Sequence, residues 1–244
     1  MKLRQPHNLI LRRFSLPVKP ILQQVDDSCG LCSLHMVLSY LGKPVPVEEL
    51  GEIIPPYPDI GLYDSHVGLS AIELGFTVTI YTYNYKIFHP IWNHLSQEEL
   101  IEKLAVKESS AKTPEEALAA KSYIAFLRAG GKLLFYPLSK ELILAHLDKN
   151  LPLIVALDMS FLYDCITYYD EFADHRATHF VVVHGYNPED NTFFLSDPWH
   201  DIPLPNQNGQ YAIDADRVIN AVFLGQERND SAIVVIESPE GGPD

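Results

Sequence analysis

Apolar and polar residues alternate with helical spacing in the first part of the chain. Between residues 29 and 42, apolar residues recur every three or four positions, which is the period of an amphipathic helix. Ser28 stands just before this run as a candidate N-cap, so Cys29 falls in the first turn. Gly42, followed by Pro44, ends the run. Comparable patterns predict further helices at 47–54, 64–75, 96–108, 113–129, 139–150 and 214–223.

Capping residues support several of these predicted helices. Ser96 and Thr113 each precede a helical run and are followed three residues later by glutamate, the arrangement of a capping box. The second of these helices also has proline at its first position. For the helix predicted at 64–75, Asp64 or Ser65 is the expected cap.

Short apolar runs with strand-forming residues appear mainly in the second half of the chain. They predict strands at 76–83, 132–137, 151–158, 179–187, 191–198 and 231–238. Because helices dominate early and strands dominate late, the order of elements indicates an α+β chain. We expect a single domain over residues 1–238, a helix-rich and acidic region at about 84–130, and a flexible tail at 239–244.

Length and charge limit the classes of partner. The chain has 244 residues, of which 47% are hydrophobic, so it is long enough to bury one substantial core. Its 18 basic and 32 acidic side chains give a formal net charge of -14, which repels nucleic acid and anionic membrane surfaces. Apolar runs such as 151–157 are too short to span a bilayer. The first residues carry no secretory cleavage site, so we expect a cytoplasmic protein with neither a nucleic-acid nor a membrane partner.

Three cysteines, Cys29, Cys32 and Cys165, are the candidates for redox or metal chemistry. An odd and sparse set makes a poor disulfide framework, which agrees with a reducing compartment. A structural zinc site needs four ligands, and no second pair with ligand spacing completes one. A thioredoxin-type pair would follow a strand, whereas a proline-containing segment precedes this one. We therefore expect no metal and no cofactor.

The remaining interpretations of Cys29 are a nucleophile and a packing residue. A thiol in the first turn of a helix is close to the positive end of the helix dipole, which favours the thiolate. Gly30 would leave this turn uncrowded, where a substrate carbonyl has to approach. The alternative is that Cys29 and Cys32 are small apolar residues in a core helix.

A thiol nucleophile needs a base and an acceptor that orients the base. His179 opens a predicted strand, and His184 lies on the opposite face because the two are an odd number of residues apart, so only one can face the site. Asp197 ends the next strand, and a hairpin of the two strands would bring its carboxylate to the start of the first. Cys29, His179 and Asp197 are thus the candidate triad.

Three blocks of sequence carry a family resemblance. "CGLCSLHMVLSYLG", then "HFVVVHGYN", then "LSDPW" resemble, in this order, the papain-like cysteine peptidases of the C39 and C39-like group. The resemblance implies a papain-like α+β fold, in which a helical part carries Cys29 on a central helix and an antiparallel sheet carries His179 and Asp197. It covers about a fifth of the chain, and residues 84–130 match nothing in the minimal peptidase, so they are expected to be a helical insertion.

The resemblance also implies an oxyanion hole and a reaction. In the family a glutamine lies six residues before the cysteine, which selects Gln23, and its amide would act together with the backbone N–H of Cys29. Gln24 is the adjacent rival. The same spacing before Cys32 leads to Asp26, whose charge would repel an oxyanion, so Cys32 is not the expected nucleophile. The implied activity is hydrolysis of a peptide or amide bond through a thioester, without a cofactor.

Two other families share parts of this layout. The Cys and His/Asp blocks are also similar to phytochelatin synthase, which would imply γ-glutamyl or peptidyl acyl transfer, and to guanylyl-cyclase-domain proteins. "DPWHD" is closer to the C39-like form, and the chain has no paired metal-binding aspartates or glycine-rich phosphate loop for nucleotide cyclisation. A catalytically inactive peptide-binding module of the same fold stays open, as does the oligomeric state. Trp199 and His200 are expected either to line the cleft or to pack beneath it.

Overall fold

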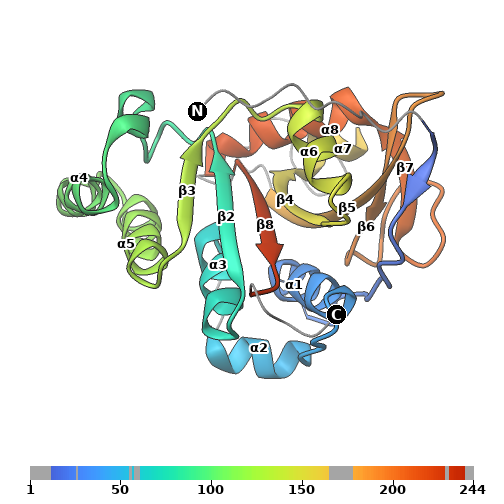
Figure 1. Ribbon diagram of the computed structural model, residues 1–244, viewed down its shortest axis with the longest axis horizontal. Helices are drawn as coiled ribbons and strands as arrows, with labels where there is room; N and C mark the ends of the chain where they lie inside the picture. Colours follow the sequence, from blue (N-terminus) through green and yellow to red (C-terminus); the bar gives the residue numbers. More distant parts are fainter. Residues whose placement is uncertain are drawn as a thin grey trace.

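A sheet of eight strands forms the centre of the part of the chain that the structure describes (Figure 1). This computed structural model describes residues 12–25, 27–54, 57, 61–164, 178–228 and 231–239. The strand order is β3-β2-β8-β4-β5-β6-β7, with β1 paired to β5 outside this path. The strands are β1 (Phe14–Ser15), β2 (Thr77–Thr82), β3 (Lys132–Phe135), β4 (Leu153–Asp158), β5 (Thr178–Asn187), β6 (Thr192–Ser196), β7 (Gln210–Asp214) and β8 (Ala232–Glu237).

Helices surround this sheet. In the view of Figure 1, α1, α2 and α3 lie in the lower part and α6, α7 and α8 in the upper part. Every residue of β4 is buried, so both faces of this central strand are covered. The helices are α1 (Cys29–Tyr40), α2 (Val47–Ile53), α3 (Asp64–Glu73), α4 (Gln97–Ser109), α5 (Pro114–Arg128), α6 (Lys140–Leu147), α7 (Met159–Tyr163) and α8 (Ala215–Leu224), with short 3-10 turns η1 (Pro90–His94) and η2 (Gly225–Arg228).

The α+β class predicted from the sequence is confirmed, and most predicted elements fall within a few residues of their observed positions. Ser96 and Thr113 do cap their helices, accepting hydrogen bonds from Glu99 N and Glu116 N at 3.2 Å each. The prediction that Asp64 or Ser65 caps α3 is wrong. The helix already includes Asp64, and its N-cap is Tyr63. The elements that were not predicted are short: β1, β7, α7 and the two 3-10 turns.

The sheet is mostly antiparallel, with one exception. Its edge strand β3 pairs with β2 in parallel, while all the other named pairs run antiparallel. β2 comes from the first half of the chain, yet it pairs with β8 near the chain's end, with Thr77 opposite Glu237. The sheet therefore draws on early and late segments alike and is not confined to the late part of the sequence.

Helix α5, from the region predicted to be an insertion, packs closely on α3. Tyr123 donates a hydrogen bond to Asp64 Oδ2 at 2.9 Å, and the hydroxyls of Ser65 and Ser122 are 2.6 Å apart, all of them buried. The domain limits and the insertion stay predictions. Of the predicted tail, residues 240–244 lie outside the described residues.

None of the helices within the described ranges is both long enough and apolar enough to cross a membrane. The cytoplasmic location stays a prediction.

Candidate active site

Helix α1 is attached to strand β5, and this contact places Cys29 close to the start of the strand. The hydroxyl of Ser33 donates a hydrogen bond to the carbonyl oxygen of Phe180 at 3.1 Å. Gly30 faces the core here: a Cβ on it would lie 3.2 Å from Val67 Cγ2 and 3.4 Å from Phe180 Cδ2. The prediction that Gly30 leaves room for a substrate is therefore wrong, since its missing side chain lets the helix approach the sheet.

The first turn of α1 begins where it was predicted, although Ser28 does not cap it. Ser28 occupies the N-cap position, yet its side chain makes no capping hydrogen bond. The hydroxyl donates instead to the carbonyl oxygen of Val25 at 2.6 Å, which tightens the preceding turn. Cys29, half-buried, is the first residue of the helix.

His179 and Asp197 form a buried pair at the end of the β5–β6 hairpin. Val182 pairs with Ser196 at this end, so Asp197, the next residue, projects beside the start of β5. Nε2 of His179 lies 2.8 Å from Asp197 Oδ1, and the two side chains are 5% and 0% exposed. A carboxylate can only accept hydrogen bonds, so Nε2 is the donor and Nδ1 is the ring nitrogen left for another partner.

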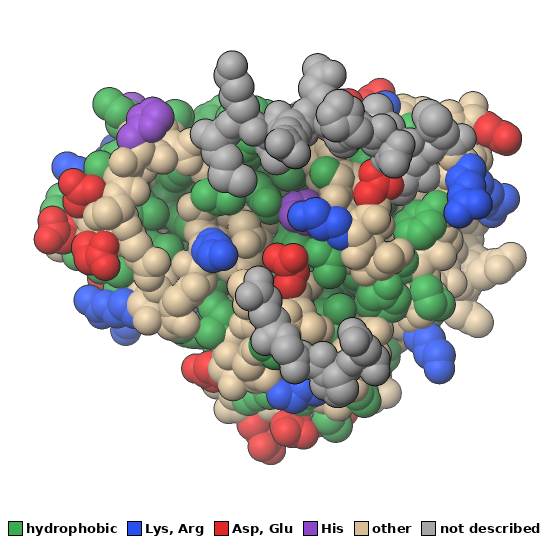
Figure 2. All heavy atoms as spheres, in the orientation of Figure 1, with side chains coloured by type: hydrophobic (Ala, Val, Ile, Leu, Met, Phe, Trp, Pro, Cys, Tyr) green, Lys and Arg blue, Asp and Glu red, His purple; other side chains and the backbone are tan. Residues whose placement is uncertain are grey.

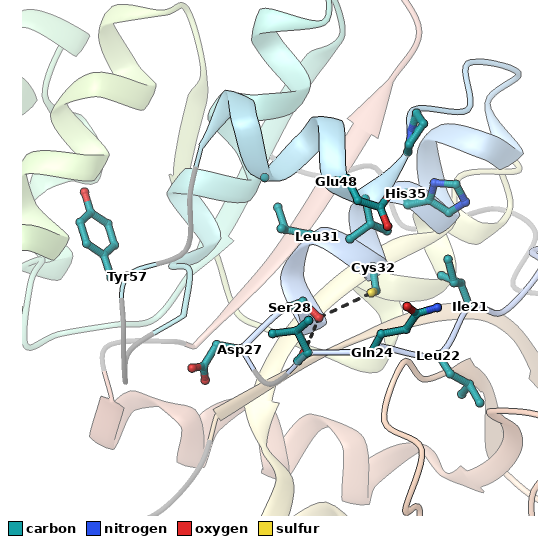
Figure 3. A pocket seen from close by; sticks show the side chains of 14 residues that line it. Ile21, Leu22, Gln24, Asp27, Ser28, Leu31, Cys32, His35, Glu48 and Tyr57 are labelled. Carbon is teal, nitrogen blue, oxygen red and sulfur yellow. Dashed lines mark hydrogen bonds between the residues drawn. The ribbon is translucent and has the colours of Figure 1, made fainter.

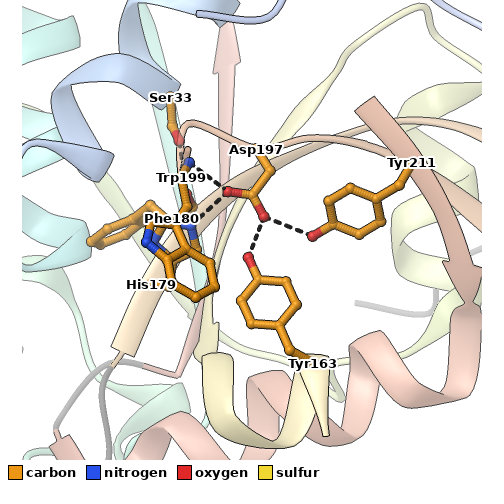
Figure 4. Close-up of polar contacts among 7 residues, drawn as sticks. All are labelled: Ser33, Tyr163, His179, Phe180, Asp197, Trp199 and Tyr211. Atoms are coloured by element: carbon orange, nitrogen blue, oxygen red, sulfur yellow. Dashed lines mark hydrogen bonds and ion pairs between the residues drawn. The ribbon is translucent and has the colours of Figure 1, made fainter. Parts of the chain in front are cut away.

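Within the part of the chain that the structure describes, three further groups donate hydrogen bonds to Asp197 (Figure 4). The backbone N–H of Trp199 donates to Oδ1 at 2.9 Å. The hydroxyl of Tyr211 donates to Oδ2 at 2.7 Å, and the hydroxyl of Tyr163 donates to the same oxygen. Neither tyrosine was found from the sequence, because they lie on β7 and α7, two elements without a clear pattern of their own.

The backbone of Asp197 is held as firmly as its side chain. Its N–H donates to the carbonyl oxygen of Gly209 at 2.8 Å. Gly209 has φ of +85°, and a Cβ there would lie 2.6 Å from the carbonyl oxygen of Asp197. Only glycine fits this close approach, which makes Gly209 another residue of the site that the sequence did not reveal.

The pKa values of the pair are displaced in opposite directions. Burial by itself lowers the pKa of His179, but the charge of Asp197, the hydrogen bond to it and the neighbouring Cys29 raise it to about 10. Burial would raise the pKa of Asp197, yet the charge of His179 and the hydrogen bonds from His179, Tyr163 and Trp199 hold it below its usual value. Near neutral pH both groups are therefore charged, and Cys29 adjoins the imidazolium.

The two glutamines before α1 point to different surroundings. The backbone N–H of Gln23 donates to the carbonyl oxygen of Pro198 at 2.7 Å, one residue beyond Asp197. The side-chain Oε1 of Gln23 is buried and finds no hydrogen-bond partner among the described residues. Gln24 instead lines a cavity together with Cys32 (Figure 3). The placement favours Gln23 as the residue nearer the candidate triad.

The cavity in Figure 3 has a volume of about 630 Å³ and mostly apolar walls. It lies on the side of α1 that carries Leu31, Cys32 and His35, whereas Gly30 and Ser33 face the sheet. Most of its remaining walls come from the segment before α1 and from α2. An apolar space of this kind adjoins the helix whose first residue is Cys29.

Sequence comparison identifies the family of this chain. Residues 15–216 match the Peptidase_C39 like family, a range that covers most of the chain. The chain belongs to this family. The resemblance that the three sequence blocks carried is thereby confirmed. No curated protein gives a significant match.

Several solved structures are similar to this member of the Peptidase_C39 like family at low identity. The double glycine motif protease of an AMS/PCAT transporter, crystallised with a leader peptide, is 16% identical, with a TM-score of 0.47 over 95% of this chain and 97% of that one. A putative C39-like peptidase from Bacillus anthracis is 14% identical, with a TM-score of 0.47 over 93% and 98%. Xylellain, a cysteine protease from Xylella fastidiosa, is 13% identical, with a TM-score of 0.49 over 93% and 86%.

The second histidine of β5 lies away from the thiol in this Peptidase_C39 like chain. The register of β5 against β6 shifts between Val183 and Gly185, which places His184 in a bulge. Its Nδ1 lies 3.1 Å from the hydroxyl of Ser15 in β1. Burial lowers the pKa of His184, so it is neutral near pH 7. Of the two histidines of β5, only His179 therefore lies at the candidate site.

The other candidate residues occupy less reactive positions. Cys32 is buried, and burial raises its pKa to about 11. Trp199 is buried against Tyr163, with ring centroids 5.1 Å apart, whereas His200 is exposed and lies 3.2 Å from Asp201 Oδ2. Asp26 and Cys165 lie outside the described residues. Within the described ranges, no group of three or more His, Cys, Asp and Glu side chains is placed to hold a metal ion.

Proposed function

We propose that this chain hydrolyses a peptide or amide bond, with Cys29 as nucleophile, His179 as acid and base, and Asp197 as the residue that orients His179. The observation that carries the proposal is the two-sided contact of His179. Its Nε2 is bonded to Asp197 at 2.8 Å, and Cys29 interacts with the same ring and raises its pKa. Membership of the Peptidase_C39 like family supports the same reaction class.

In the proposed reaction, His179 is the imidazolium with a proton on Nδ1, and Cys29 reacts as the thiolate beside it. The thiolate attacks the carbonyl carbon, and the resulting oxyanion accepts hydrogen bonds from the Gln23 amide and the backbone N–H of Cys29. The imidazolium then gives its Nδ1 proton to the leaving amine as the C–N bond breaks, which leaves a thioester. Neutral His179 then takes a proton from water, the hydroxide attacks the thioester and releases the acid product, and the Cys29 thiolate and the His179 imidazolium are restored.

A peptide is the substrate class that we propose. The cavity of about 630 Å³ beside α1 offers apolar walls to a side chain of an extended or helical peptide. Its lining includes Gln24, the neighbour of the proposed oxyanion-hole residue, so a peptide that reaches the thiol passes close to it. A simple primary amide would leave this space empty.

Labelling with chloroacetamide, a thiol electrophile that carries an amide, tests the proposed nucleophile. We expect Cys29 to react much faster than Cys32, and we expect this rate to fall in His179→Gln, which can still donate a hydrogen bond to Asp197. The matched control is His184→Gln, which alters a buried histidine of the same strand without touching the triad. Equal and slow labelling of both cysteines, independent of His179, would refute the proposal.

Digestion of a peptide library tests the reaction itself. We expect cleavage by the wild type and by Cys32→Ala, and none by Cys29→Ala.

Incubation with glutathione and a metal ion separates hydrolysis from acyl transfer, because γ-glutamyl transfer products would identify an acyltransferase. Rapid Cys29 labelling without any cleaved or transferred product would identify the inactive binding module.

A further inference from the structure

Two buried tyrosine hydroxyls occupy the carboxylate oxygen of Asp197 that His179 does not use. Oδ1 accepts from the His179 ring and from the backbone of Trp199. Oδ2 accepts from the hydroxyls of Tyr163 and Tyr211. A carboxylate offers about four lone-pair positions, so these four donors fill its capacity. Figure 4 shows Asp197 between His179 and Trp199 on one side and the two tyrosines on the other.

Because Asp197 is buried, its carboxylate depends on the hydrogen bonds that these two hydroxyls donate. The carboxylate has no exposed surface, so solvent does not replace a donor that is lost. The last torsion of an aspartate side chain is broad and roughly two-fold, and the backbone alone does not set the tilt of the carboxylate. Donors on both oxygens set it, and with it the direction in which the imidazole of His179 points.

The elements that carry the tyrosines are themselves anchored. Arg217 of α8 donates from Nε to the carbonyl oxygen of Leu162 at 2.8 Å and from Nη2 to that of Phe161 at 2.7 Å, which holds the last turn of α7. Tyr163 is the final residue of that helix. Tyr211 lies on β7, where it pairs with Leu195 of β6 two residues before Asp197. Both hydroxyls therefore reach Asp197 from rigid supports.

We propose that Tyr163 and Tyr211 are positioning residues that hold the carboxylate of Asp197 in the orientation and the ionised form that His179 requires. This inference rests on the proposed hydrolysis. Neither phenol contacts the reacting atoms in this arrangement, and neither lines the cavity of Figure 3. Their loss should therefore act on the chemical step and leave substrate binding largely unchanged.

The ionised form of Asp197 depends on all its neighbours. Among the described residues, the titratable groups in contact with its carboxylate are His179 from β5, Tyr163 from α7 and Tyr211 from β7, and Cys29 adjoins the far side of His179. The hydroxyl of Tyr163 helps to keep the pKa of Asp197 low. Without such donors the carboxylate holds a proton at higher pH, and a protonated Asp197 no longer supports the imidazolium.

Tyr163→Phe, Tyr211→Phe and the double variant test this role. Each single change keeps the ring and removes one hydroxyl, and we expect kcat to fall on the order of tenfold with KM little changed. The acidic limb of the rate profile should move up by about one pH unit. Tyr186→Phe is the matched control, because it removes a buried hydroxyl that donates to Asn191 at 3.0 Å and not to Asp197.

An NMR titration keeps this inference separate from the proposed hydrolysis. In a Cys29→Ala background, which needs no turnover, the carboxyl carbon signal of Asp197 should titrate about one pH unit higher in the tyrosine variants than in Tyr186→Phe. This shift would support the positioning role even if no peptide is cleaved. Titration midpoints and kcat values equal to those of Tyr186→Phe, with a lower melting temperature alone, would overturn it and leave the hydrolysis standing.

Discussion

At the scale of single residues, Asp197 and His179 stabilise one another's charge. Both side chains are buried, at 0% and 5% exposed, so each would be unfavourable as an isolated ion. The pKa of Asp197 lies below its usual value and that of His179 above it, because each charge favours the other against the effect of burial. Stability and the proposed chemistry therefore depend on the same pair.

We expect the stabilising effect of this pair to be greatest between about pH 4 and pH 6.5. The folded-state pKa of His179 is raised to about 10, so its contribution is complete below the unfolded value and is lost as the pH rises toward 10. The folded-state pKa of Asp197 is lowered, so its contribution is lost as the pH falls through that lowered value.

Urea unfolding of the wild type and of His179→Gln at about pH 5, 7 and 9 measures this dependence. The difference in the free energy of unfolding between the two proteins should shrink from pH 5 to pH 9. Tyr186→Phe serves as the control, since it removes a hydroxyl that donates to Asn191 and not to the pair. A difference that stays constant with pH would contradict the charged state of the pair.

At the scale of elements, two helical glycines lie at contacts between helices, and only one of these contacts is too close for a larger residue. In α3, a Cβ on Gly68 would lie 2.8 Å from Phe126 Cε2 of α5. In α2, a Cβ on Gly51 would lie 3.5 Å from Leu31 Cδ1, an ordinary contact distance. The two helical glycines therefore look alike in the sequence and differ in their neighbours.

We expect Gly68→Ala to destabilise the protein by about 1–3 kcal/mol, because the methyl group forces α5 away from α3. Gly51→Ala should stabilise it by up to about 1 kcal/mol, because alanine favours the helix and finds room. Thermal and urea unfolding of the two variants measure both effects. An unchanged stability in Gly68→Ala would show that the contact between α5 and α3 is loose.

At the scale of the whole molecule, acidic side chains are gathered on particular helices. The net charge is -14, and Figure 2 shows acidic side chains over α2 at the bottom of the view and over α4 at its left. Glu48 of α2 also lines the cavity of Figure 3. The exposed acidic residues of these two helices include Glu48, Glu49, Glu52, Glu98, Glu99 and Glu102.

We expect basic peptides to be cleaved with a higher kcat/KM than neutral ones, by roughly tenfold at low salt, because the acidic surface attracts them. Added salt should reduce this advantage, since it screens the charges. Matched lysine and glutamine peptides at low and high sodium chloride measure it. The double variant Glu48→Gln/Glu49→Gln should weaken the preference more than the double variant Glu98→Gln/Glu102→Gln. An equal effect of both would show that the preference depends on net charge alone.

The sequence by itself determined the α+β class, most helix and strand positions and the identity of Cys29, His179 and Asp197 as candidates. These are consequences of short-range rules. Capping by Ser96 and Thr113, apolar periodicity in α1 and the antiparallel β5–β6 hairpin each depend on residues close together in the chain. The family resemblance was also visible in the sequence, because its three blocks occur in the same order along the chain.

Only the tertiary structure decided which distant groups complete the site. Tyr163 and Tyr211 meet at Asp197 because α7 and β7 converge there, and nothing local marks either residue. The bulge that directs His184 to Ser15 depends on the partner strands of β5. The different surroundings of Gln23 and Gln24 depend on how the extended segment passes between Pro198 and the cavity. Contacts between segments far apart in the chain arise from tertiary packing. Neither hydrophobic periodicity nor a capping residue indicates them in the sequence.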